Sequence, residues 1–148
     1  MASTSAEQDR TPLQWAEACN TRMKGNSAIY DFLLNTIELV SAEHGKAVAR
    51  LTVEKCHVNS RGTLHGAVSA TLTDWAGGIA IATTGREKTG VSTDIHVTYV
   101  GTAKVGDVLT IETHASKVGG TLAFTSIEIK KEDGSVVATG THTKYVKI

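Results

Sequence analysis

The 148-residue sequence is short of several residue types that mark large protein classes. Cys19 and Cys56 are its only cysteines, too few for a disulfide framework or a four-cysteine zinc site, so we expect a reducing compartment. Lysine plus arginine and aspartate plus glutamate both total 15, which leaves no basic surplus of the kind that nucleic-acid binding requires. With one proline and 5% aromatic residues, the chain predicts a single ordered domain with an aliphatic core and no nucleic-acid partner.

A long uncharged apolar run is also missing. The most apolar stretch, residues 66–85, is rich in glycine, alanine and threonine and carries Asp74, so no membrane span is expected. Residues 1–10 are polar, include Glu7 and Asp9, and lack the apolar region of a secretory signal. We therefore expect a cytoplasmic protein, with the mitochondrion as the alternative.

The N-terminal part of the chain predicts helices. Thr11 is a good N-cap, Pro12 suits the first helical position, and Gln14 completes a capping box. Gly25 is expected to end this helix, and a shorter helical piece follows over residues 27–33. We treat residues 1–36 as an N-terminal helical segment.

From residue 37 onward the apolar pattern changes to a period of two, which is typical of strands. Short turns containing glycine or aspartate separate the predicted strands, which cover residues 49–53, 91–100, 108–117, 122–130 and 136–146.

Between the early and late strands, residues 66–83 are apolar on most sides, which predicts a buried helix with Gly85 as its C-terminal cap. Residues 37–148 therefore predict an α+β fold, in which one antiparallel sheet wraps around a long central helix.

Asp74 is the only ionisable residue of this apolar stretch. Burial of an unpaired carboxylate costs on the order of several kcal/mol. Two interpretations follow: Asp74 has a catalytic function, or it hydrogen-bonds a neighbouring strand.

The loop over residues 59–67 leads into the predicted helix, whose first N–H groups and dipole suit a developing oxyanion. Gly66 allows a substrate carbonyl to approach the backbone closely, and Asn59 offers an amide donor. The alternative is an ordinary loop whose Asn59 and His65 satisfy its own backbone.

Ser92, Asp94 and His96 alternate along a predicted strand and are expected to share one face. We reject a catalytic triad among them, because side chains two apart on a strand run parallel and cannot form a chain of hydrogen bonds. Ser92 is the residue of interest. The sequence has no Walker A, dinucleotide-binding or H-E-x-x-H motif, and its six histidines lack metal-ligand spacing, so neither a metal nor a cofactor is expected.

The residues from Asn59 through Asp74 resemble the signature of hotdog-fold acyl-CoA thioesterases. The branch they resemble holds phenylacetyl-CoA thioesterases and proteins like thioesterase superfamily member 2. Further parts of the chain share the resemblance, namely residues 91–94, 98–99, 103–104, 121–126 and 140–144.

The resemblance implies a hotdog fold and hydrolysis of a fatty or aryl acyl-CoA to the free acid and CoA, a reaction of lipid metabolism that needs no cofactor. The Gly66 N–H and Asn59 would polarise the thioester carbonyl, and His65 would support that loop or the thiolate side. Asp74 would act as general base on water or as nucleophile, and Ser92 would help to hold the water.

The resemblance also implies where the acyl-CoA substrate binds. The implied substrate-binding residues are Tyr99, Val100, Gly101, Thr102, Ala103, Lys104, Lys117, Val118, Gly119, Gly120, Thr121, Leu122 and Tyr145. Ala67 and Trp75 depart from the pattern of many relatives and bear on the size of the substrate.

Helix geometry predicts that one chain is not enough. Gly66 and Asp74 are separated by roughly 12 Å along one helix, whereas attack on a carbonyl needs reacting atoms about 3–3.5 Å apart. A second copy of the helix, antiparallel across a two-fold axis, would close this gap, and Ala70, Gly77 and Gly78 are small enough to permit its approach.

The resemblance likewise implies a homo-oligomer, either a dimer or a dimer of dimers (a homotetramer), with shared active sites. Two alternative functions remain: a hotdog dehydratase or hydratase, and a non-catalytic acyl-CoA-binding protein.

Overall fold

The N-terminal helices begin and end close to the predicted residues. The computed structural model describes residues 9–148, so the first part of the segment 1–36 lies outside the described residues. Helix α2 (Pro12–Asn26) has the predicted capping box, in which the Gln14 N–H donates to Thr11 Oγ1 at 3.2 Å and the Thr11 N–H donates to Gln14 Oε1 at 2.9 Å. Helix α3 (Ala28–Leu33) follows after Ser27.

Six antiparallel strands form one sheet in the order β1-β2-β4-β5-β6-β3. The predicted strands are confirmed to within a few residues at each end. Strand β1 (Glu38–Glu43) was not among them. The other five strands are β2 (Lys46–Thr52), β3 (Val91–Tyr99), β4 (Val108–Val118), β5 (Leu122–Lys131) and β6 (Val136–Tyr145).

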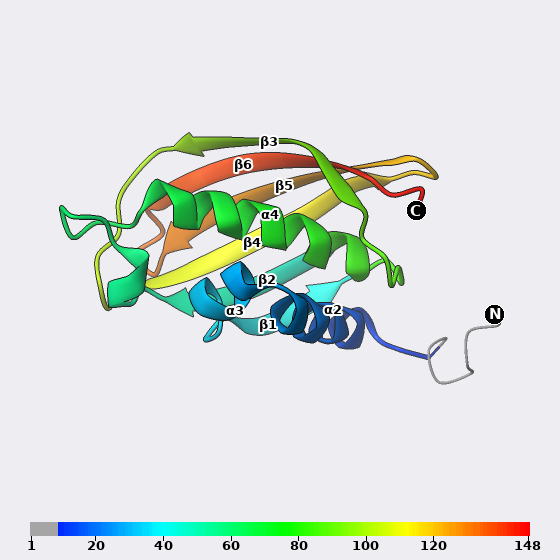
Figure 1. Cartoon of the computed structure of the whole chain (residues 1–148), viewed down its shortest axis with the longest axis horizontal. Helices are drawn as coiled ribbons and strands as arrows, with labels where there is room; N and C mark the ends of the chain where they lie inside the picture. Colours follow the sequence, from blue (N-terminus) through cyan, green and yellow to red (C-terminus); the bar gives the residue numbers. More distant parts are fainter. Residues whose placement is uncertain (1–8) are drawn as a thin grey trace.

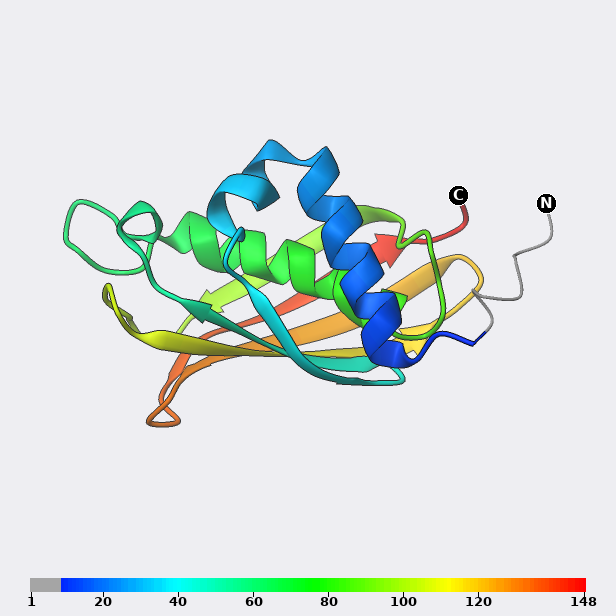
Figure 2. The same cartoon turned by 90° about the horizontal axis from the view of Figure 1, so that it is seen from below.

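Helix α4 (Gly66–Ala82) crosses the inner face of this curved sheet. Helices α2 and α3 cover the side of α4 that faces away from the sheet (Figures 1 and 2). Residues 75–82 are all buried, so the second half of α4 is covered on every side, as expected for a helix that is apolar all round. The predicted α+β fold, a sheet wrapped around a long central helix, is therefore confirmed. No helix within residues 9–148 is long and apolar enough to cross a membrane.

The glycines of α4 pack inside the chain. A methyl group on Gly77 would meet His142 of β6 and Thr125 of β5, and one on Gly78 would meet Met23 of α2. The prediction that Gly77 and Gly78 admit the helix of a second copy is therefore wrong, because neighbours in the same chain already cover both residues.

Strand β3 contains an irregularity that the sequence pattern does not reveal. Ser92 pairs with Lys144 of β6, but Asp94 pairs with Thr143, so Thr93 is an extra residue. Such a β-bulge reverses the alternation of side chains. Ser92 faces inward with buried Lys144, whereas Asp94 faces outward, and the prediction that Ser92, Asp94 and His96 share one face is wrong for Ser92.

Candidate functional site

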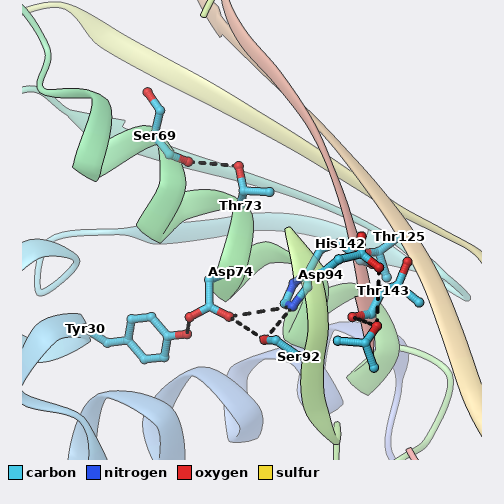
Figure 3. Close-up of polar contacts among 10 residues, drawn as sticks. Tyr30, Ser69, Thr73, Asp74, Ser92, Asp94, Thr125, His142 and Thr143 are labelled. Carbon is cyan, nitrogen blue, oxygen red and sulfur yellow. Dashed lines mark hydrogen bonds and ion pairs between the residues drawn. The ribbon is translucent and has the colours of Figure 1, made fainter. Parts of the chain in front are cut away.

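Four polar side chains from four different elements meet halfway along α4 (Figure 3). Tyr30 of α3 donates from its hydroxyl to Asp74 Oδ2 at 2.5 Å. On the other side of the carboxylate, Ser92 Oγ of β3 lies 3.4 Å from Asp74 Oδ1. Ser92 Oγ also contacts His142 Nε2 of β6 at 2.8 Å, and that nitrogen lies 3.8 Å from Asp74 Oδ1. The structure thus brings the predicted Asp74 and Ser92 together.

The carboxylate of Asp74 differs from the buried, unpaired group that the sequence suggested. Its side chain is 36% exposed and has polar neighbours on both sides. The cost of an unpaired buried carboxylate therefore does not arise, and the contact with Ser92 of β3 agrees with the alternative in which Asp74 hydrogen-bonds a neighbouring strand. A carboxylate that is reachable and hydrogen-bonded can accept a proton from a bound water.

His142 is a component of this site that the sequence analysis missed as a functional residue. Its side chain is 1% exposed, and burial, followed by the nearby Lys144 ammonium, lowers its pKa, while Asp74 acts in the opposite direction. The imidazole is therefore neutral near pH 7.

Although Ser92, His142 and Asp74 are of the triad types, they are not arranged as a triad. Ser92 and Asp74 both face the same ring nitrogen, Nε2, and the other nitrogen, Nδ1, has no hydrogen-bond partner among residues 9–148. A triad needs the base between its two partners, one on each nitrogen. This geometry favours water activation by Asp74 over attack by the serine.

Tyr30 is the second residue that sequence reasoning missed. Burial raises the pKa of its phenol, and the hydrogen bond to Asp74 and the negative charge of Asp74 raise it further, so Tyr30 remains a donor at every physiological pH. Nothing in the short helical stretch singles out Tyr30. His142 had a detectable signal, since it occupies an inward position of β6 in line with buried Ala138 and Lys144.

The loop before α4 has the geometry of a donor site at the helix N-terminus. His65 is the N-cap, and its Nδ1 accepts from the Ala67 N–H at 3.0 Å. The Gly66 N–H belongs to the first helical residue, so it has no partner inside the helix. The Ala67 N–H is not available to a substrate, because it already donates to His65.

Asn59 is oriented by its own loop. Its Oδ1 accepts from the backbone N–H groups of Arg61 at 2.9 Å and Thr63 at 3.3 Å. Because these partners are donors, the oxygen must face them, and the Nδ2 amide points away from the loop. The alternative interpretation, in which the loop satisfies itself, thus holds for the oxygen of Asn59 and leaves its NH₂ group as a free donor among the described contacts.

One group of the predicted substrate-binding residues lies beside this loop. The Tyr99 hydroxyl donates to the Gly66 carbonyl at 3.1 Å. The Leu64 N–H donates to the Ala103 carbonyl at 2.8 Å, which joins the segment 99–104 to the loop. Lys104 is exposed and forms no ion pair in the part of the chain that the structure describes.

The other group lies at the opposite end of α4, where the β4–β5 turn is located (Figure 1). Leu122 pairs with Tyr145 across β5 and β6, and Arg86 donates to the Gly119 carbonyl at 3.0 Å, which supports the turn over residues 117–122. One chain therefore does not bring the two groups together. Since α4 is continuous from Gly66 past Asp74, Gly66 and Asp74 likewise remain roughly 12 Å apart along the helix.

Trp75 lies in the core and not in the site. Its ring is fully buried, and its Nε1 donates to Asn20 Oδ1 of α2 at 3.1 Å. Trp75 thus packs α2 onto α4 and does not bear directly on the size of the substrate. Across residues 9–148, no three side chains of histidine, cysteine, aspartate or glutamate are grouped as metal ligands would be.

Three comparisons relate this chain to known proteins. Residues 61–138 match the thioesterase superfamily. Human acyl-coenzyme A thioesterase 13 is 42% identical over 118 residues, which are 79% of this chain and 84% of that protein. The crystal structure of zebrafish thioesterase superfamily member 2 has a TM-score of 0.82 and 35% identity, and the match covers 93% of this chain and 99% of that chain. A Streptococcus mutans protein bound to acetyl-CoA has a TM-score of 0.71 and 25% identity, and the match covers 75% of this chain and 88% of that chain.

Proposed function

Because the chain belongs to the thioesterase superfamily, we propose that it is a hotdog-fold acyl-CoA thioesterase that hydrolyses its substrate to a free acid and CoA. The observation that carries the proposal is the placement of Asp74. This partly exposed carboxylate lies on the central helix, and its Oδ1 is 3.4 Å from Ser92 Oγ and 3.8 Å from His142 Nε2. Human acyl-coenzyme A thioesterase 13 and the acetyl-CoA-bound Streptococcus mutans protein support acyl-CoA as the substrate class.

The reaction begins with a water held by Asp74 and Ser92. Asp74 takes a proton from the water as the water oxygen bonds to the thioester carbon. The carbonyl oxygen becomes negatively charged and is stabilised by the Gly66 N–H and the Asn59 amide. The carbon–sulfur bond then breaks, and the proton passes from Asp74 to the departing CoA thiolate.

The roles of the neighbouring side chains follow from their contacts. Neutral His142 contacts Ser92 Oγ at 2.8 Å and thereby fixes the serine side chain beside the water. His65 holds the start of α4 in place through the Ala67 N–H and thereby orients the Gly66 N–H.

The site is completed by a second copy of the chain. Gly66 and Asp74 are roughly 12 Å apart on one helix, too far to act on one carbonyl. Strand β3 is an edge of the sheet with a free row of backbone groups, and its apolar Val91 and Tyr99 are 56% and 58% exposed. A two-fold related copy at this edge would bring Gly66 of one protomer towards Asp74 of its partner. The oligomer is a dimer or a dimer of dimers.

The same symmetry unites the two groups of CoA-binding residues. Residues 99–104 beside Gly66 of one protomer would face residues 117–122 and Tyr145 of the other. Lys104 and Lys117 are exposed and free of ion pairs among the described residues, so either can meet a CoA phosphate. The compartment stays a prediction.

A hydrolysis assay with a thiol-detecting reagent and a panel of fatty and aryl acyl-CoAs tests the proposal. Release of CoA supports the thioesterase, whereas a dehydratase or hydratase changes the acyl chain without releasing thiol, and a carrier binds without turnover. Asp74→Asn should reduce kcat by about 10²–10⁴-fold with the fold intact, since a general base is lost. Asp31→Asn, an exposed aspartate on α3, is the matched control and should behave as wild type. Near wild-type turnover by Asp74→Asn would refute the role of Asp74.

A single turnover in heavy-oxygen water distinguishes the two chemical roles of Asp74. Water activation places the label directly in the acid product. Nucleophilic attack by Asp74 forms an anhydride, and hydrolysis at the Asp74 carbonyl then leaves the label in Asp74.

A further inference from the structure

Helix α3 places a phenol directly on the catalytic carboxylate. The bond from the Tyr30 hydroxyl to Asp74 Oδ2 is 2.5 Å long, whereas Ser92 Oγ lies 3.4 Å and His142 Nε2 3.8 Å from Oδ1 (Figure 3). Hydrogen bonds to a charged acceptor are the strong ones, and they weaken as they lengthen. Of these three contacts, the one from Tyr30 therefore restrains the carboxylate most.

Helix α3 is itself held at both ends. Ser27 Oγ accepts from the Tyr30 N–H at 3.4 Å at its start. At its end, buried His57 contacts the Leu33 carbonyl through Nε2 at 2.7 Å, and Leu34 is fully buried in the core. His57 Nδ1 accepts from the Glu54 N–H at 2.9 Å, so the ring is tied on both nitrogens. These contacts give Tyr30 a defined position over α4.

We propose that Tyr30 is a positioning residue for hydrolysis, which holds Asp74 Oδ2 so that Oδ1 faces Ser92 and the attacking water. This inference rests on the proposed function of Asp74. Rotation about the last bond of an aspartate side chain is loosely restrained, and a carboxylate that is 36% exposed has water as a competing partner. Tyr30 removes this freedom by occupying one oxygen and leaving the other for the reaction.

Tyr30 lies outside residues 61–138, the part of the chain that matches the thioesterase superfamily. Helix α3, which precedes the first strand of the sheet, thus contributes this contact to a carboxylate on the central helix α4. The neighbouring Ile29 and Phe32 are 62% and 64% exposed, whereas Tyr30 packs against the core, so α3 turns the Tyr30 side chain towards α4.

The test is Tyr30→Phe, which removes the hydroxyl and keeps the ring. We expect kcat to fall by about tenfold or more, as for loss of a charge-assisted hydrogen bond, with KM changed by no more than about twofold. The melting temperature should change by only a few degrees, and Asp31→Asn on the same helix should leave kcat, KM and melting unchanged.

A double-mutant cycle shows whether Tyr30 acts through Asp74. In single turnovers, Tyr30→Phe should have no further effect in the Asp74→Asn background, because the group that it positions is gone. An equal fall in both backgrounds, or wild-type kcat in Tyr30→Phe, overturns the inference. If instead Asp74→Asn is itself fully active, the proposed function fails first, so the two failures are distinguishable.

Discussion

Gly77 and Gly78 of α4 offer a matched pair of substitutions that tests how His142 is held. An added methyl on Gly77 would lie 2.5 Å from His142 Nδ1 and 2.9 Å from Thr125 Oγ1, well inside the distances that packed atoms tolerate. A methyl on Gly78 would lie 3.3 Å from Met23 Cε, the mobile end of a flexible side chain. Gly77→Ala should therefore displace the imidazole, whereas Gly78→Ala should be accommodated.

The size of the effect follows from two opposing terms. Either alanine favours the helix over glycine by about 1 kcal/mol, so this gain cancels when the two variants are compared. Overpacking at Gly77 should cost about 2 kcal/mol, which lowers the melting temperature by roughly 4–8 °C relative to Gly78→Ala. Thermal unfolding at one fixed protein concentration measures this difference, since oligomerisation makes melting concentration-dependent.

The same pair is then compared in the hydrolysis assay. Gly77→Ala should lower kcat, because a displaced His142 no longer fixes Ser92, while Gly78→Ala keeps wild-type kcat. Equal melting and equal activity of the two variants would refute the packing argument. Loss of oligomers in both variants would instead show that the glycines lie at a contact between copies.

Two further predictions concern charge. Burial gives His142 a lower pKa in the folded chain than in the unfolded chain, so the unfolded chain binds the proton first and stability falls as the pH drops below about 6.5. His142→Gln should reduce the dependence of the melting temperature on pH between pH 7.5 and pH 5. An unchanged dependence would contradict the assignment of a buried neutral imidazole. Lys104→Ala or Lys117→Ala should raise KM for acyl-CoA more than it lowers kcat, and this effect should fade at high salt. The control, Lys46→Ala on the outer face of β2, should leave KM unchanged. Unchanged KM in both test variants would count against the proposed CoA path.

Most of the fold was predictable because it depends on patterns that repeat along the chain. The Thr11 capping box, the alternation from residue 37 and the apolar stretch over residues 66–83 each have a local physical cause. Asp74 and Ser92, both predicted from the sequence as site residues, lie close together because α4 and β3 pack against each other. Their roles remain predictions, and the assays above test them.

The remaining features of the site depend on contacts between distant segments. The extra Thr93 that turns Ser92 inward is visible only in the pairing of β3 with β6. Tyr30 reaches Asp74 across 44 positions of sequence, and a six-residue helix has too little pattern to reveal which side faces inward. Asp74 was expected to be buried because its helix is apolar, but its 36% exposure depends on how distant segments pack around α4.

A subunit-mixing experiment tests most directly the central claim, that one hydrolytic site uses Gly66 and Asn59 from one protomer and Asp74 from its partner. Asn59→Ala and Asp74→Asn, each poorly active alone, are combined in equal amounts under conditions that exchange subunits, and acyl-CoA hydrolysis is measured. Random exchange makes half of the dimers mixed with one intact site of two, so about a quarter of wild-type activity should return. Verified mixed dimers without any recovery would show that the site is not shared.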